Sequence, residues 1–327
     1  MLYPLTFQPI FKERVWGGRR LQELYGKPLP TGVRIGESWE ITDRPEGVSV
    51  ITNGPLAGRS LRWLMENHGA ELLGNGTAVA GRFPLLVKLL DARDVLSLQV
   101  HPPAAMAAAL GGEPKSEMWY FTDTTSDACI HVGLRRGVTR GEFERRIRDG
   151  SVADCIHRIA VRRGDAMFLP SGRVHALGAG CVLVEIQQNS DTTYRVFDWN
   201  RTGLDGKPRE LHIEQALASI DFSDFEPSLA PGESFGNEVL DGVRLVDNPL
   251  FTVSRVCLQR HDLLTVRSPV PLVLGVLDGT LEIAGEEQGQ PLTLKPGEFC
   301  LLPANVTATL STPEKVSFLQ AVVGQTS

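Results

Sequence analysis

The chain has 327 residues, 42% of them hydrophobic, and a formal net charge of −6 at pH 7. This length exceeds that of a usual single domain, so we expect two domains, each with its own core. The mildly acidic balance provides no basic surface for nucleic acid or an anionic membrane, and no apolar run approaches the roughly 20 residues of a membrane span. We therefore expect a cytoplasmic protein without a nucleic-acid or membrane partner.

Glycine and proline punctuate the chain, with 33 and 21 copies, and they separate short β-rich runs. This rhythm favours an all-β fold of the jelly-roll type over alternating strands and helices. Candidate strands lie, in chain order, at 83–90, 95–101, 119–123, 128–132, 166–169 and 182–187.

Few helices are expected. One follows Ser60 and closes at His68-Gly69, and Thr139-Arg140-Gly141-Glu142 fits a capping box that opens a charged helix to about Arg148. A third is expected at 212–220.

The segment 229–233 has the composition of a linker, so we predict one domain at 1–230 and a C-terminal domain at 231–327. Gly297 and Pro303 repeat the Gly-x5-Pro spacing that begins at Gly164. The repeat predicts a second jelly roll, with strands at 273–283 joined by an Asp278-Gly279 hairpin turn. Asn305 and Ala308 replace Gly172 and His175 there, so we expect no metal site in this second copy.

Five cysteines are widely spaced and form no C-x-x-C pair. Neither a disulfide framework nor a thiolate zinc site is expected, and the cysteines fit small core positions. Histidine and carboxylate side chains are better candidates for metal ligands. The segment 164–175 has the punctuation of a strand, a turn and a second strand that ends in His175, and alternation places Ser97, Gln99 and His101 on one strand face.

Lys115 and Glu117 share a face if their segment is extended. Two imidazoles, a carboxylate and an amide suit zinc with an open coordination position. An isolated histidine on a strand is more often a packed, hydrogen-bonded residue than a ligand. The other four histidines are interpreted as structural or surface residues: His68, His131, His157 and His212.

These patterns resemble a known family. Gly164-x5-Pro170-x-Gly172-x2-His175 is similar to the second half of the cupin signature. Gln99-Val100-His101-Pro102, followed by the run 115–120, resembles type I mannose-6-phosphate isomerases, and the runs 35–40 and 185–195 resemble their short bacterial form. The similarity spans most of residues 1–220 and is weaker beyond. Pro103-Ala104-Ala105-Met106 stands where many members carry acidic residues.

The resemblance implies two cupin-type jelly rolls, with one Zn²⁺ per chain in the first only. It implies an enzyme that interconverts mannose 6-phosphate and fructose 6-phosphate by proton transfer between C1 and C2 through a cis-enediol intermediate. The implied metal ligands are His101, Glu117, His175 and Gln99, and the implied catalytic residues are Arg195, Lys115, Glu185 and Asp191. Candidate donors to the substrate phosphate are Ser97, Lys88 and Arg195.

Several alternatives stay open at this point. The general acid and base are unassigned, because Lys115 can act as a base or neutralise substrate charge. Zinc is not ranked against manganese, cobalt or iron, and the oligomeric state is not assigned. Trp16 and Trp39 fit either a sugar pocket or the core. The other functions are a metal cupin with iron-dependent oxygenase chemistry or another sugar phosphate as substrate, and a non-catalytic cupin that binds a sugar phosphate.

Overall fold

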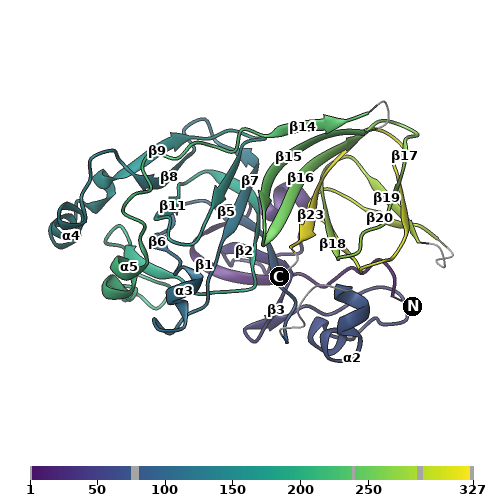
Figure 1. The fold of residues 1–327 in the computed structure, drawn as a ribbon, viewed down its shortest axis with the longest axis horizontal. Coiled ribbons are helices and arrows are strands. Elements are labelled where there is room, and N and C mark those ends of the chain that lie inside the picture. The colour runs from purple at the N-terminus through teal and green to yellow at the C-terminus, as the bar shows by residue number, and fades with distance from the viewer. Residues whose placement is uncertain (1, 75–80, 238–239, 286–289, 325–327) are drawn as a thin grey trace. The chain divides into compact units, whose positions relative to one another are not determined.

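The computed structural model describes residues 2–74, 81–237, 240–285 and 290–324. Most of the elements are antiparallel strands (Figure 1). The expectation of an all-β fold with two cupin-type jelly rolls and a few short helices is confirmed. No described helix has the length and apolar character needed to cross a membrane.

Two sheets build the first jelly roll. The order of the six-stranded sheet is β1 (Ile10–Gly18), β2 (Ile35–Ile41), β5 (Leu85–Ala92), β12 (Cys181–Gln188), β7 (Glu117–Thr124) and β10 (Ala166–Leu169). The order of the five-stranded sheet is β13 (Tyr194–Phe197), β6 (Leu98–Val100), β11 (His175–Leu177), β8 (Cys129–Leu134) and β9 (Ile156–Ala160). Each of the six strands expected in this part of the chain is found, with ends displaced by at most three residues.

A second pair of sheets follows. The six-stranded sheet runs β14 (Glu233–Gly236), β15 (Leu240–Asn248), β16 (Phe251–Leu258), β23 (Val316–Val323), β18 (Leu272–Asp278) and β21 (Phe299–Leu302). The four-stranded sheet runs β17 (Leu263–Val266), β22 (Ala308–Ser311), β19 (Leu281–Gly285) and β20 (Leu292–Leu294). A small ladder joins β3 (Asp43–Arg44) to β4 (Gly47–Val48).

The larger sheets of the two jelly rolls have the same strand order, and within the described ranges the smaller sheet of the second lacks a counterpart of β13. Both contain a strand from the Gly-x5-Pro motif, β10 or β21, at the edge of the larger sheet, and Gly164 and Gly297 both have positive φ. His175 opens β11, and Ala308 opens β22 at the equivalent place. Among the described residues, one group of metal-ligating side chains converges in the first jelly roll and none in the second.

The predicted hairpin at Asp278-Gly279 is wrong. The turn connects β18 to β19, but β18 pairs with β21 and β23, whereas β19 pairs with β20 and β22. Gly279 has φ 78°. The turn therefore carries the chain from one sheet of the jelly roll to the other, as the double-sheet topology requires.

The helices are α1 (Arg20–Tyr25), α2 (Leu61–Leu73), α3 (Ala104–Ala107), α4 (Arg140–Asp149) and α5 (Ile213–Ser219), with a 3-10 turn at Val152–Cys155. The predicted N-caps are confirmed: Ser60 Oγ accepts from the Trp63 amide at 3.1 Å, and Thr139 Oγ1 accepts from the Glu142 amide at 3.2 Å. The predicted end at His68 is wrong, because α2 continues to Leu73. His68 leaves helical geometry at φ −136° and ψ 22°, so the place predicted as an end is a kink.

The contacts within the chain define two compact units. One comprises 1–10, 39–87 and 231–327, and the other comprises 11–38 and 88–230. The predicted domains at 1–230 and 231–327 stay a prediction. The units share its division after Ala230, and they also group 1–10 and 39–87 with the C-terminal residues.

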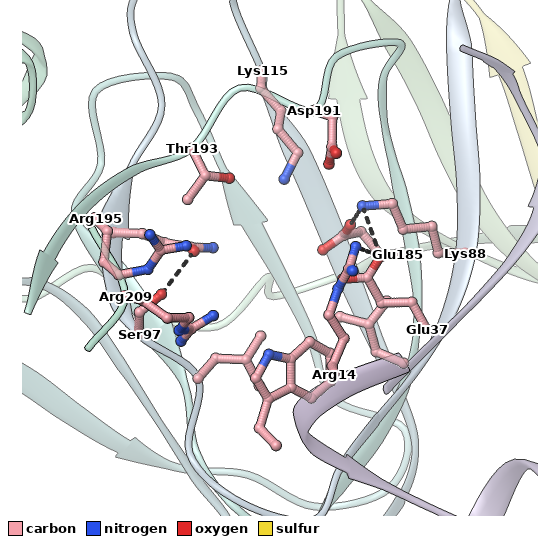
Figure 2. Close-up of a pocket in the computed structure, with 14 residues that line it drawn as sticks. Arg14, Glu37, Lys88, Ser97, Lys115, Glu185, Asp191, Thr193, Arg195 and Arg209 are labelled. Carbon is pink, nitrogen blue, oxygen red and sulfur yellow. Dashed lines mark hydrogen bonds and ion pairs between the residues drawn. The ribbon is translucent and has the colours of Figure 1, made fainter. Parts of the chain in front are cut away.

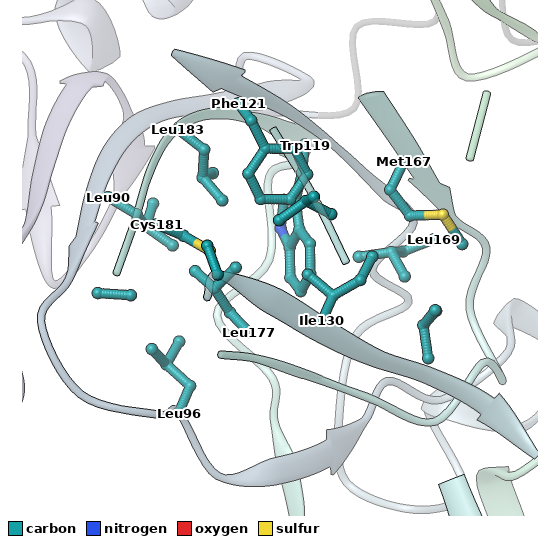
Figure 3. Close-up of a cluster of buried hydrophobic side chains, with 14 of the residues drawn as sticks. Leu90, Leu96, Trp119, Phe121, Ile130, Met167, Leu169, Leu177, Cys181 and Leu183 are labelled. Carbon is teal, nitrogen blue, oxygen red and sulfur yellow. The ribbon is translucent and has the colours of Figure 1, made fainter. Parts of the chain in front are cut away.

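The core of the first jelly roll lies between its two sheets. Trp119, Phe121 and Met167 of the larger sheet pack with Ile130 and Leu177 of the smaller one (Figure 3). The other face of the smaller sheet packs against α4 and α5 through a second cluster that includes Phe143 and Ala216. The smaller sheet thus uses its inner face for the core and the site, while helices cover its outer face.

A second core fills the C-terminal jelly roll with aliphatic and aromatic side chains.

Trp39 is 1% exposed and is one of the largest fully buried side chains. All five cysteines are buried and have free thiols, as predicted for core residues.

A candidate metal centre and its pocket

Two histidines and a glutamate converge in the first jelly roll. His101 follows β6, Glu117 opens β7, and His175 opens β11. Their side chains are at most 1% exposed, and the potential ligand atoms lie within 4.8 Å of one another. We call these three residues the metal group.

Backbone carbonyls orient both imidazoles. His101 Nδ1 lies 2.8 Å from the carbonyl oxygen of Thr192, and His175 Nδ1 lies 2.9 Å from that of Arg173. A carbonyl only accepts, so each Nδ1 carries the proton and each Nε2 keeps its lone pair. Such a hydrogen bond behind the ring is the usual support of a metal-binding histidine. The Trp119 ring stands edge-on to His175, with a centroid separation of 5.4 Å.

Glu117 is the charged member of the metal group. Its carboxylate oxygens lie 3.5 Å from His101 Nε2 and 3.3 Å from His175 Nε2, and Lys115 Nζ lies 2.5 Å from Oε2. Neither oxygen accepts a hydrogen bond of acceptable geometry from any residue that the structure describes. Two lone pairs on nitrogen and an orphaned buried carboxylate form a donor set that fits a divalent cation.

The protonation states also suit a metal. Burial, reinforced by the Lys115 ammonium, lowers the pKa of His101 to about 3, so its imidazole is neutral at pH 7. Burial opposes ionisation of Glu117, but Lys115 and His101 outweigh it and hold the pKa of this carboxyl well below its usual range. Neutral imidazole and ionised carboxylate are the forms that bind a metal.

Gln99 lies beside the metal group in the smaller sheet. It pairs with His175 on one side and with Arg195 on the other, so the three side chains form a line across three strands. Gln99 Nε2 lies 3.4 Å from His175 Nε2, while Ser97 Oγ donates to Gln99 Oε1 at 3.4 Å. A half-turn of the amide exchanges the two atoms and directs the oxygen towards the metal group.

A pocket with a volume of about 320 Å³ opens beside this group (Figure 2). Such a volume suits a small molecule. Its lining contains five cations and three carboxylates, together with three uncharged polar residues and three apolar ones. The cations are Arg14, Lys88, Lys115, Arg195 and Arg209, and the carboxylates are Glu37, Glu185 and Asp191. The uncharged polar residues are Ser97, Gln99 and Thr193. The positive excess suits an anionic ligand.

Alternating charges cross the larger sheet along one wall of the pocket. Arg14 Nε in β1 donates to Glu37 in β2 at 2.8 Å, and Lys88 Nζ in β5 lies 4.0 Å from Glu37 and 3.0 Å from Glu185 in β12. Trp119 Nε1 in β7 donates to the other oxygen of Glu185 at 2.9 Å. We call these four charged residues, Arg14, Glu37, Lys88 and Glu185, the charge row.

The charge row fixes the state of its buried members. Burial opposes the Lys88 charge, but Glu185 and Glu37 outweigh it and raise the pKa of Lys88 well above its usual value. Both oxygens of Glu185 are engaged, by Lys88 and by Trp119. Its carboxylate is therefore held at one position in the pocket wall.

The remaining predicted residues line the same pocket. Ser97 is 3% and Lys115 is 4% exposed. Asp191 is exposed, and Arg195 is partly buried with its Nη1 donating to the Glu210 carbonyl at 2.7 Å. Trp16 also lines the pocket, whereas Trp39 does not. The structure thus brings the predicted ligands and pocket residues into one region of the first jelly roll.

Sequence reasoning missed four polar lining residues, namely Arg14, Glu37, Thr193 and Arg209. Glu37 is one of two glutamates in β2, whose seven residues are all buried, and a buried carboxylate needs a partner. Arg14 is that partner. Thr193 and Arg209 lie outside the strands, where no periodicity indicates which way a side chain faces.

Comparisons with known proteins agree with this geometry. Residues 5–123 match the model of the phosphomannose isomerase type I catalytic domain. Mannose-6-phosphate isomerase ManA of Bacillus subtilis is 36% identical over 92% of this chain and 93% of its own length. The crystal structure of the mannose 6-phosphate isomerase from Bacillus subtilis superposes with a TM-score of 0.89 at 30% identity, covering 98% of this chain and 99% of that one.

A mannose 6-phosphate isomerase solved with zinc bound has a TM-score of 0.76 at 18% identity, over 99% of this chain and 100% of that one, and it shares the fold. The ManA match extends over almost the full length of both chains. This chain therefore belongs to the type I phosphomannose isomerase family.

Proposed function

We propose that this protein interconverts mannose 6-phosphate and fructose 6-phosphate. The observation that carries the proposal is the convergence of His101, Glu117 and His175 beside a pocket rich in cations. The ManA relative and the superposed Bacillus subtilis structure, both mannose-6-phosphate isomerases, support the same reaction. The substrate class is accordingly a small sugar phosphate.

We assign one Zn²⁺ per chain to the metal group, with Gln99 as a fourth ligand through its amide oxygen. A nitrogen and carboxylate donor set with a position left open is typical of catalytic zinc. When bound, the ion polarises a carbonyl and stabilises the negative charge of an enediolate. Each histidine offers Nε2, because its Nδ1 is committed to a backbone carbonyl.

The reaction moves a proton between C1 and C2 of the open-chain sugar through a cis-enediol. The proposed proton-transferring and charge-stabilising residues are Lys115, Glu185, Asp191 and Arg195, which line one pocket. Glu185 is held by Lys88 and Trp119, so it meets the sugar in one orientation. Arg195 donates hydrogen bonds and stabilises developing negative charge.

Ser97 and Arg195 are proposed donors to the substrate phosphate, on the side of the pocket opposite the charge row (Figure 2). The prediction that Lys88 also binds phosphate stays a prediction. Its ion pairs with Glu185 and Glu37 favour a positioning role, because a phosphate at Lys88 faces two carboxylates. The cytoplasm as the site of the reaction also stays a prediction, and it fits a chain with five free, buried thiols.

The test is a coupled assay of mannose 6-phosphate conversion by the zinc-loaded protein, with the epimer glucose 6-phosphate in parallel. We expect turnover of mannose 6-phosphate at a kcat/KM at least about tenfold above that of its epimer. Arg195→Gln is expected to keep its zinc and to lose about a hundredfold or more in kcat. Absence of mannose 6-phosphate turnover in fully loaded protein contradicts the proposal.

A further inference from the structure

Three arginines and one aspartate form a cluster at the edge of the pocket. The Asp198 side chain is 6% exposed, and its carboxylate accepts hydrogen bonds from Arg209 Nε at 2.6 Å and Nη2 at 2.5 Å. It also accepts hydrogen bonds from Arg201 Nε at 3.0 Å and Nη2 at 2.9 Å. Arg195 is electrostatically coupled to both arginines. We call Arg195, Arg201 and Arg209 the arginine cluster, with Asp198 as its buried counterion.

The two arginines that bind Asp198, Arg201 and Arg209, differ in whether they line the pocket. Arg201 also donates to the Val95 carbonyl and lies 3.8 Å from Asp94, and it does not line the pocket. Arg209 does line the pocket, 22% of its side chain is exposed, and its Nη1 has no acceptor among the described residues. Asp198 therefore fixes one edge of the Arg209 guanidinium and leaves the other edge available.

The cluster carries more positive charge than its surroundings neutralise. Arg201 and Arg209 bind the buried carboxylate of Asp198, Arg195 interacts with it only electrostatically, and the nearby Asp94 and Glu210 side chains are exposed to solvent. Arg195 Nε is buried without a hydrogen-bond partner among the described residues. Burial, with repulsion from Arg209, lowers the pKa of Arg195, as expected for a cation that lacks an anion.

We propose that Arg209, positioned by Asp198, binds the phosphate group of the substrate together with Arg195 and Ser97. A phosphate dianion supplies the missing negative charge and enough acceptors for both guanidinium groups. The three side chains gather on one side of the pocket, and Glu37, Lys88 and Glu185 lie on the other (Figure 2). In the charge row, Arg14 and Lys88 already balance Glu37 and Glu185, so the uncompensated positive charge for a phosphate lies on the side of Arg195 and Arg209.

This inference rests on the proposed function, so its test measures binding separately from turnover. The probe is glucitol 6-phosphate, which has no carbonyl and cannot isomerise. Its Kd is measured by calorimetry on zinc-loaded full-length protein, at fixed salt. Arg209→Gln is expected to weaken binding about tenfold or more, the loss typical for a charge-assisted hydrogen bond. Arg209→Lys is expected to restore part of the affinity, because it keeps the charge but not the fork.

Arg201→Gln is the matched control, because it removes the other arginine on Asp198 without changing the pocket lining. Its Kd is expected within about threefold of wild type. Asp198→Asn is expected to raise KM for mannose 6-phosphate by about tenfold with kcat nearly unchanged, which loss of fold does not produce. Wild-type affinity in Arg209→Gln, or an equal loss in Arg201→Gln, overturns the inference.

The two proposals fail separately. Phosphate-dependent binding that is lost in Arg209→Gln, without mannose 6-phosphate turnover in wild type, supports the phosphate site and contradicts the isomerase function. Normal isomerisation in wild type, with undiminished glucitol 6-phosphate binding in Arg209→Gln, keeps the function and overturns the role of Arg209.

Discussion

Glu117 is a fully buried carboxylate that its neighbours keep ionised but do not saturate with hydrogen bonds. Neither oxygen accepts a hydrogen bond from the described residues, and Lys115 is its cationic partner at 2.5 Å. Burying an ionised group without full pairing costs several kcal/mol of stability. Lys115 offsets this cost, and a divalent cation bound to Glu117 and the two Nε2 atoms would use the carboxylate lone pairs that accept no hydrogen bond from the described residues.

Replacing Glu117 with glutamine is expected to abolish zinc retention. The amide has the same shape, but it removes the negative charge that balances the cation. Metal content is measured on purified protein by mass spectrometry, and far-ultraviolet circular dichroism checks that the β-fold persists. Stoichiometric zinc in this variant removes Glu117 from the ligand set.

Glu185→Gln is the control for that experiment. Glu185 is also a buried glutamate at the pocket, but it binds Lys88 and Trp119 and is not in the metal group. We expect it to retain zinc and to lose turnover. Loss of zinc in both variants indicates a general disturbance of the pocket.

Strand alternation and glycine–proline spacing are local signals, and they indicated His101, Glu117 and His175 as candidate ligands, whereas their place around one metal was implied by the family resemblance. The pocket contacts of Arg209 were not predictable in this way. Arg209 lies in an irregular segment after β13, and its orientation depends on Asp198, eleven residues earlier in the chain. No periodicity predicts a side-chain direction set by such a contact.

The charge row illustrates how neighbouring strands build a site that no single strand contains. Its members come from β1, β2, β5 and β12, and each buried charge has a partner on the next strand. The order of the strands in the sheet therefore determines the order of the charges. Sequence identified Lys88 and Glu185 as polar pocket residues, but their pairing depends on the strand order, which the sequence did not reveal.

Replacing Lys88 with methionine is expected to destabilise the protein by about 3 kcal/mol or more, because Glu185 and Glu37 lose a buried counterion. The free energy of unfolding is measured in urea, and turnover is measured on the same sample. We expect kcat to fall while the zinc content is retained. Unchanged stability and turnover in Lys88→Met show that the ion pair between Lys88 and Glu185 is needed neither for folding nor for catalysis.

The predicted N-cap of helix α4, Thr139, can be tested by substitution. Thr139→Ala removes the acceptor for the Glu142 amide and is expected to cost about 1 kcal/mol of unfolding free energy. Thr139→Ser retains an acceptor and serves as the control. Turnover is expected to remain normal in both, because Thr139 does not line the pocket. Equal stability of the two variants contradicts the role of the cap.

The start of a helix was easier to predict than its end. Ser60 and Thr139 act through amides three residues away, so the signal is contained in the sequence. At His68 the histidine and the glycine after it were interpreted as a helix end, but Leu72 and Leu73 are buried beyond the kink. Burial of these leucines favours continuation of α2 past an unfavourable local sequence.

At the scale of the whole chain, the jelly-roll topology occurs twice, with different side chains at equivalent positions. By strand register, Leu272 of β18 occupies the place of Glu117, because each pairs with the last residue of the motif strand. Ala308 likewise stands in the place of His175. The second jelly roll therefore fills with aliphatic side chains the positions at which the first carries metal ligands. The Gly-x5-Pro repeat predicted this relation, but it did not reveal that 39–87 join the C-terminal unit.

Buried thiols provide a test of both cores. Burial raises the pKa of Cys181 to about 12 and also raises that of Cys300. A thiol whose pKa is higher in the folded state stabilises the fold at neutral pH and loses this contribution as pH rises from about 9 towards 12. We expect both thiols to resist alkylation at pH 8.5 in native protein and all five cysteines to react in guanidinium. Rapid native alkylation of Cys181 or Cys300 contradicts the described packing.

The most direct test of the account measures bound zinc and mannose 6-phosphate turnover on the same samples, before chelation, after chelation and during stepwise restoration of zinc. We predict that turnover rises in proportion to bound zinc, reaches its maximum at one ion per chain, and is absent at every zinc concentration in His175→Ala. Full turnover in metal-free protein, or in His175→Ala, would contradict the central claim that isomerisation depends on a metal held by His101, Glu117 and His175.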